Sequence, residues 1–187
     1  MAGFDSIAST PAERGSLERL RAATGESDGP MERHCLRCRH IAARIAARRH
    51  WVIDGEVLTV AALLHDIGLY ADFATDDAYT ADGATAAREL LAPAGWSPER
   101  MQLCAEAIDR HHDLRRQLSR GAEVEALRLA DLVDLTGGRL GFGTQREWLA
   151  QLFASEPRRG MYREIGAQLR RALRERPLTL PKIFLRP

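Results

Sequence analysis

The chain has 187 residues, of which 45% are hydrophobic, and its 27 basic and 26 acidic residues give a formal net charge of +1. This length and hydrophobic content predict one domain with a substantial core over residues 1–187. The near balance of charge predicts neither nucleic acid nor a membrane surface as a partner. Residues 1–5 do not resemble a leader, and no apolar run reaches the roughly 20 residues of a membrane span, so we expect a cytoplasmic protein.

Helix-capping residues predict the elements in chain order. Thr10 is a typical N-cap, with Pro11 at the first helical position and Glu13 at the third. Pro30 and Pro98 likewise suit the first turn of a helix. We expect helices at residues 11–23, 31–49, 55–64, 80–91, 98–112, 123–135, 144–154 and 157–176, a loop at 70–80 and a Pro-rich tail at 177–187. Strand patterns are absent, so the predicted fold class is all-α.

The cysteines do not indicate a site of their own. Cys35 and Cys38 form a Cys-x-x-Cys spacing, which in other contexts indicates a redox dithiol or half of a zinc site. A redox motif would follow a strand, and a structural zinc site would need a second close pair, whereas only Cys104 remains. We therefore interpret all three as small buried residues on helices.

The adjacent residues His65 and Asp66 follow the apolar run at residues 60–64, at the end of a predicted helix. Burying an imidazole and a carboxylate there is costly unless a partner compensates both. A divalent cation satisfies both groups at once. The pair therefore predicts half of a metal site.

Two further polar residues fall on inward helix faces. His34 shares a face with Ile41 at helical spacing. Asp131 follows Leu127 and precedes Leu135 in steps of four, which favours an inward carboxylate. These two residues are the expected partners of the His-Asp pair.

Together, the four residues resemble the signature of the HD-domain superfamily of metal-dependent hydrolases, which is a His, an adjacent His-Asp and a distant Asp, all on helices. The resemblance covers about residues 30–140 and includes three motif-like segments, residues 34–37, 61–68 and 127–134. It implies an orthogonal helical bundle with the metal site in its core. The helix at 11–23 and the helices within 144–176 would then pack on that core.

The resemblance implies one divalent transition metal, Zn²⁺, Fe²⁺ or Mn²⁺, held by the ligands His34, His65, Asp66 and Asp131. Members with two metals usually supply further His residues after the pair, yet none occurs between His65 and His111. The position at which the diiron oxygenase branch has a His corresponds to Asp82. A second metal is therefore less favoured, although a carboxylate could still bind one.

Three residues are candidates for catalysis. His111 lies in an Ala-Ile-x-x-His pattern that recurs in HD proteins and is the preferred proton-transfer residue, with Asp66 as a second candidate. Arg37 could hold a ligating carboxylate or polarise a substrate oxygen. The candidate substrate contacts are Asp82, His112, Arg115 and Asp134. His112 and Arg115 are equally consistent with an exposed helix end, and Asp134 with an exposed acid.

The expected function is hydrolysis of a small molecule by a metal-activated water, as in an HD phosphohydrolase or a hydratase-like enzyme. Leu69 replaces the Lys that often follows the His-Asp motif in phosphohydrolases, which weakens the case for phosphate. Residues 82–91 look like the cyanamide-hydratase-like HD proteins, which add water to a small nitrile. A diiron oxygenase and a non-catalytic, metal-binding regulatory module are the alternatives. The sequence does not specify the substrate, and it is compatible with a homo-oligomer.

Overall fold

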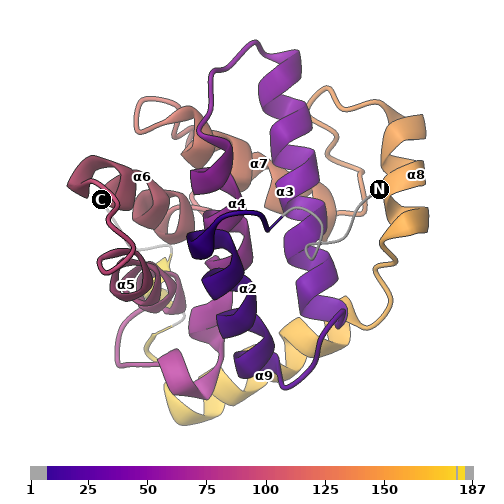
Figure 1. Ribbon diagram of the computed structural model, residues 1–187. Helices are drawn as coiled ribbons and strands as arrows, with labels where there is room; N and C mark the ends of the chain where they lie inside the picture. The colour runs from indigo at the N-terminus through magenta and orange to yellow at the C-terminus, as the bar shows by residue number, and fades with distance from the viewer. Residues whose placement is uncertain (1–7, 180, 184–187) are drawn as a thin grey trace.

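The computed structural model describes residues 8–179 and 181–183 (Figure 1). Its helices are α2 (Pro11–Thr24), α3 (Pro30–Arg48), α4 (Gly55–Leu64), α5 (Tyr79–Leu91), α6 (Pro98–Asp109), α7 (Ala122–Leu135), α8 (Arg146–Ser155) and α9 (Met161–Glu175). The described residues also form the short 3-10 helices η1 (Ile67–Leu69), η2 (Ala71–Phe73) and η3 (Pro181–Ile183). No strand occurs in the part of the chain that the structure describes, so the all-α prediction is confirmed. The expectations for residues 1–5 and 184–187 lie outside the described residues.

Helix α4 lies at the centre of the bundle, between α3 on one side and α5 and α6 on the other (Figure 1). All residues from Val57 to Leu64 are buried, which is the pattern of a helix with neighbours on every face. Asp54 caps its N-terminus, where Oδ1 accepts hydrogen bonds from the backbone N–H groups of Glu56 and Val57. The helix ends directly before His65 and Asp66, which therefore emerge in the interior. No helix among the described residues combines the length and apolar character that a membrane span needs.

The helix predicted over residues 98–112 ends earlier, at Asp109. Arg110 leaves the helical conformation with φ −106° and ψ 7°. Nδ1 of His111 then donates to the carbonyl oxygen of Ile108 at 2.6 Å, which satisfies one of the last carbonyls of α6. Because His111 and His112 lie in this turn and not on a helix, their rings can face one region, with centroids 4.0 Å apart.

Helix α9 begins at Met161, later than the predicted start at residue 157, because Gly160 adopts a left-handed φ of 88°. It lies beneath α3 and beside η1 (Figure 1). The hydroxyl of Tyr70 donates to Glu164 at 3.1 Å, and the guanidinium of Arg171 donates to the carbonyl oxygen of Leu69. These bonds hold α9 against the segment that follows the His-Asp pair.

Candidate metal centre

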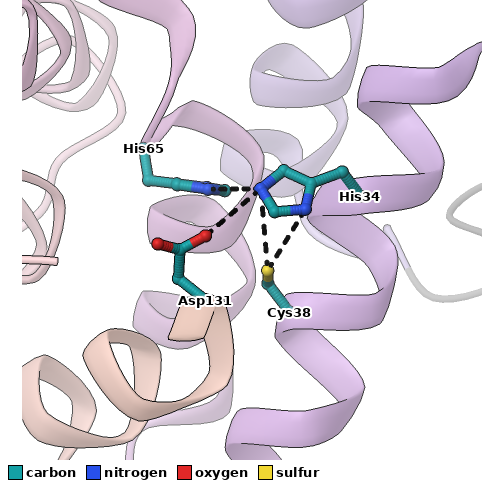
Figure 2. A group of neighbouring side chains, drawn as sticks. All are labelled: His34, Cys38, His65 and Asp131. Atoms are coloured by element: carbon teal, nitrogen blue, oxygen red, sulfur yellow. Dashed lines mark hydrogen bonds and ion pairs between the residues drawn. The ribbon is translucent and has the colours of Figure 1, made fainter. Parts of the chain in front are cut away.

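Three helices bring the four predicted ligands together. His34 comes from α3, His65 and Asp66 from the end of α4, and Asp131 from α7. Nε2 of His34 lies 3.2 Å from Nε2 of His65 and 3.4 Å from Oδ1 of Asp131 (Figure 2). The same atom lies 3.5 Å from Oδ2 of Asp66. No residue of the four is more than 5% exposed. The chain therefore folds two imidazoles and two carboxylates into one buried cluster.

The Nδ1 atoms of three histidines are engaged away from the cluster. Nδ1 of His34 donates to Oδ2 of Asp134 at 2.7 Å. Nδ1 of His65 and Nδ1 of His111 donate to the backbone carbonyl three residues earlier, at 2.9 and 2.6 Å. Each bond fixes the tautomer and directs the lone pair of Nε2 inward, which is how proteins orient metal-ligating histidines.

The cluster contains polar atoms that no protein group satisfies. Nε2 of His111 and Oδ2 of Asp131 are buried without a hydrogen-bond partner among the described residues. The lone pairs of His34 Nε2 and His65 Nε2 face each other at 3.2 Å, an unfavourable contact unless a cation or a proton lies there. Because an unpaired buried polar atom is costly, and because imidazole and carboxylate are typical ligands of transition metals, these residues fit a divalent cation.

Both carboxylates lie between two groups of histidines. Asp66 directs Oδ2 toward His34 and places Oδ1 3.5 Å from Nε2 of His111. Asp131 directs Oδ1 toward His34 and places Oδ2 3.4 Å from Nδ1 of His112. The potential ligand groups consequently overlap, and the set on the His111 side shares members with the set on the His34 side.

The electrostatic environment keeps the cluster acids ionised. Burial disfavours the charged form of Asp66, but His65, His111 and His34 outweigh it and hold the pKa of this carboxyl well below its usual value. Burial, reinforced by His111, lowers the pKa of His112 to about 4. At neutral pH the site therefore offers ionised Asp66 as an anionic ligand and neutral His112 as a hydrogen-bonding group.

Arg37 and Asp134 lie behind His34. The guanidinium of Arg37 forms two hydrogen bonds with Asp134, at 2.7 and 2.8 Å, and reaches the carbonyl oxygen of Pro157 at 3.2 Å. Burial would raise the pKa of Asp134, yet His34 and Arg37 lower it to about 2. One predicted role of Arg37 was to hold a carboxylate that ligates the metal. Arg37 does hold a carboxylate, but this carboxylate, Asp134, orients His34 through a hydrogen bond. The side chains of Arg37 and Asp134 are both fully buried, so Asp134 is not an exposed acid, and neither residue is among the described residues that line the cavity beside the cluster.

Two predicted substrate contacts lie elsewhere. The carboxylate of Asp82 accepts hydrogen bonds from the backbone N–H and the hydroxyl of Thr75, at 3.0 and 2.5 Å, and so holds the loop before α5. Arg115 is exposed in the segment between α6 and α7. The structure therefore does not bring Asp82 or Arg115 to the cluster. Asp82 stands at the start of a helix, and nothing in its sequence position distinguished a loop contact from a site contact.

Two residues near the site were not predicted as site residues. The thiol of Cys38 lies 3.7 Å from Nδ1 and 3.9 Å from Nε2 of His34 (Figure 2), and its spacing of one helical turn from His34 was the available signal. The hydroxyl of Tyr79 donates to Nε2 of His112. Tyr79 is buried at the first position of α5, and only its place at the end of the predicted loop could have indicated it.

The fold and the cluster define a class, helical proteins with a buried His and Asp set suited to a metal. A model of the HD-domain family matches residues 31–136, which is more than half of the chain. The protein belongs to the HD-domain family, most of whose members are metal-dependent hydrolases. No curated protein matches the chain. The more specific resemblance to cyanamide-hydratase-like proteins stays a prediction.

Proposed function

We propose that this protein is a metal-dependent hydrolase that adds water to a small molecule. The observation that carries the proposal is the pair of Nε2 atoms of His34 and His65, which face each other at 3.2 Å with both Nδ1 donors already engaged. His34, His65, Asp66 and Asp131 would hold the ion, which we expect to be Zn²⁺, Fe²⁺ or Mn²⁺. When bound, such an ion lowers the pKa of water and so supplies a nucleophile near neutral pH.

His111 is the residue that we expect to move a proton. Its Nδ1 donates to the backbone, which leaves Nε2 as the nitrogen that can accept a proton. That atom lies 3.5 Å from Oδ1 of Asp66 and has no hydrogen-bond partner in the described chain. A buried imidazole with one free nitrogen beside the cluster is suited to general acid and base catalysis.

A second candidate function is oxidation at a two-metal centre. The carboxylates of Asp66 and Asp131 each present one oxygen to His34 and the other to His111 or His112, so a second ion would find ligands on the far side. A diiron oxygenase would contain two irons per chain and would consume oxygen. The first function is preferred because Asp82, which stands where that branch has a His, is engaged by Thr75.

The test combines metal content with turnover. Wild-type protein, His65→Ala and Asp66→Ala would be compared by elemental analysis and on a panel of phosphate esters, nitriles and amides. His50→Asn is the matched control, because His50 is exposed and its φ of 55° suits asparagine. We expect the wild type and the control to hold metal and hydrolyse one class of compound, and both site variants to lose metal and activity with their helical circular dichroism retained.

The contrary results differ for each alternative. Full metal content in both site variants would show that the cluster is misassigned. Stoichiometric metal without turnover on the whole panel would favour a regulatory module over an enzyme. Two irons per chain with oxygen consumption, measured after anaerobic loading, would favour the oxygenase.

A further inference from the structure

A cavity of 360 Å³ opens directly onto the candidate metal centre. This volume is near the lower end of the roughly 300–1,000 Å³ of ligand pockets, so it suits a small molecule. Four of the eight described lining residues are aliphatic, and they come from three elements. Leu135 comes from α7, Ile165 and Leu169 from α9, and Ile183 from η3. An aliphatic group in this space would be removed from water on every side that these residues cover.

The polar end of the cavity is formed by four side chains. Asp66 and Asp131 belong to the cluster, and Tyr79 and His112 lie beside it. The Tyr79 hydroxyl donates to Nε2 of His112, whose Nδ1 is 3.4 Å from Oδ2 of Asp131. The cavity therefore has a polar end at the cluster and an apolar remainder, which matches a molecule with one polar head and one aliphatic part.

The described residues that line the cavity offer no Arg or Lys to a charged head group. Three basic side chains of α9 and the segment after it donate hydrogen bonds to backbone oxygens. Arg171 donates to Leu69, Arg176 to Thr75 and Lys182 to Asp76. One oxygen of a phosphate dianion could bind the metal ion of the proposed function. Its remaining charged oxygens would lie beside aliphatic side chains, without an Arg or Lys partner among the described lining residues, which is costly.

From these observations we infer that the substrate is an uncharged small molecule whose polar group lies at Asp66 and Asp131 and whose compact aliphatic part lies against α7, α9 and η3. The inference rests on the proposed hydrolase function and adds the chemical class of the substrate. Leu135, Ile165, Leu169 and Ile183 are then the residues that determine specificity. Because apolar burial scales with area, they select the length of the aliphatic part.

The test uses aliphatic hydroxamic acids, from acetohydroxamic to octanohydroxamic acid, which are uncharged in solution near neutral pH and release one proton when they chelate a metal. Alkyl phosphonates with the same chains are the charged comparison. Isothermal titration calorimetry on the zinc-loaded protein would measure both series. We expect affinity for the hydroxamates to rise by about fourfold per methylene until the cavity is filled. We expect each phosphonate to bind more weakly than the hydroxamate of equal length. Affinity that is independent of length, or tighter binding of phosphonates, would overturn the inference.

Variants of α9 assign the effect to the cavity wall. Leu169→Gln should reduce the gain per methylene, whereas Leu173→Gln should leave it unchanged, because Leu173 lies one turn further on and is 53% exposed. If Leu169→Gln fails to fold, Ile165→Ala is the second variant. It enlarges the cavity and should move the plateau in affinity to longer chains. An unchanged plateau in Ile165→Ala would contradict the inference.

The titrations separate this inference from the proposed function. If the protein holds no zinc and acetohydroxamate does not bind, the metal site is wrong and both proposals fail. If zinc and acetohydroxamate bind but longer chains add nothing, the hydrolase proposal stands and the assignment of the cavity fails. Zinc binding with the expected dependence on length and charge supports both.

Discussion

The carboxylate of Asp134 accepts a hydrogen bond from Nδ1 of His34 at 2.7 Å, across 100 residues of sequence. This bond determines which imidazole nitrogen faces the cluster, because the nitrogen that donates to Asp134 cannot also bind a metal. Arg37 keeps Asp134 ionised and in place with two further hydrogen bonds. The packing of α3 against α7 is thereby coupled to the orientation of a candidate ligand.

We predict that Asp134→Asn weakens metal binding without removing a ligand. The amide lacks the charge that favours the Nδ1–H tautomer of His34, and its NH₂ group can face either His34 or Arg37. Loss of such a supporting group typically costs 10- to 100-fold in metal affinity, and we expect about that loss for zinc. Competition with a chromophoric chelator would measure the zinc affinity. The control is Asp72→Asn, because Asp72 is exposed.

The same substitution should also lower stability. Arg37 is fully buried and would lose its only carboxylate partner among the described residues. Breaking a buried ion pair from one side costs about 3–5 kcal/mol, so the free energy of unfolding of the metal-free protein should fall by about that amount. Urea denaturation would test this. A variant as stable as Asp72→Asn would contradict the account of Arg37 as a positioning residue.

Metal should stabilise the fold through Asp131. A ligand that binds only the native state at about 100 times its Kd adds about 2.7 kcal/mol, so zinc should raise Tm and a chelator should lower it. We expect Asp131→Asn to lose most of this zinc-dependent shift, because one carboxylate of the cluster is gone. Differential scanning calorimetry with and without zinc gives the comparison, and His50→Asn should respond as the wild type does. An undiminished shift in Asp131→Asn would exclude it as a ligand.

Local sequence signals predicted the helices and the residues that meet at the cluster. The capping box at Thr10 and Glu13 is present in the structure, and the step of four from Leu127 to Asp131 placed that carboxylate inward. Both signals depend on residues within one helix. The boundary of α6 was predicted less well, because the side chain of His111 satisfies a helix carbonyl from outside the helix.

The walls of the cavity could not be predicted, because they depend on contacts between distant segments. Leu169 reaches the site only since α9 lies against η1, which the Tyr70–Glu164 hydrogen bond helps to hold. The contacts of Asp82 could not be predicted for a similar reason. Its carboxylate turns to Thr75 in a loop whose conformation has no periodic signal.

Gly68 should be intolerant of a side chain. A Cβ there would overlap the carbonyl oxygen of Tyr79 at the start of α5, and backbone cannot move as the end of a flexible side chain can. We expect Gly68→Ala to cost about 1–3 kcal/mol or more and to weaken metal binding, because the residue follows the His-Asp pair. Gly166→Ala is the control, since its Cβ would meet only the side chain of Arg170 at 3.4 Å. Equal urea midpoints for the two variants would contradict this prediction.

Asp54 should make the stability of the protein depend on pH. It caps α4 and forms an ion pair with Arg100, with 2.6 Å between Oδ2 and Nε. The hydrogen bond from Arg100 is the main cause of the lowered pKa of Asp54 in the folded protein. The contribution of its charge is therefore fully present above the unfolded value of about 3.9 and is lost as pH falls through the lower, folded pKa.

The comparison of Asp54→Asn with the wild type isolates this charge, because asparagine can still cap the helix. We expect the variant to be less stable by about 0.2–1 kcal/mol at neutral pH, the range of partly exposed ion pairs, and by progressively less below about pH 4. Asp54→Ala should lose about 1 kcal/mol more at neutral pH, because it also removes the cap. Urea denaturation across this pH range gives the three curves, with the exposed Glu89→Gln as the control. The contrary result is a difference in the free energy of unfolding between Asp54→Asn and the wild type that stays constant down to about pH 2, below the usual carboxyl range. It would show that the ion pair with Arg100 does not act through charge.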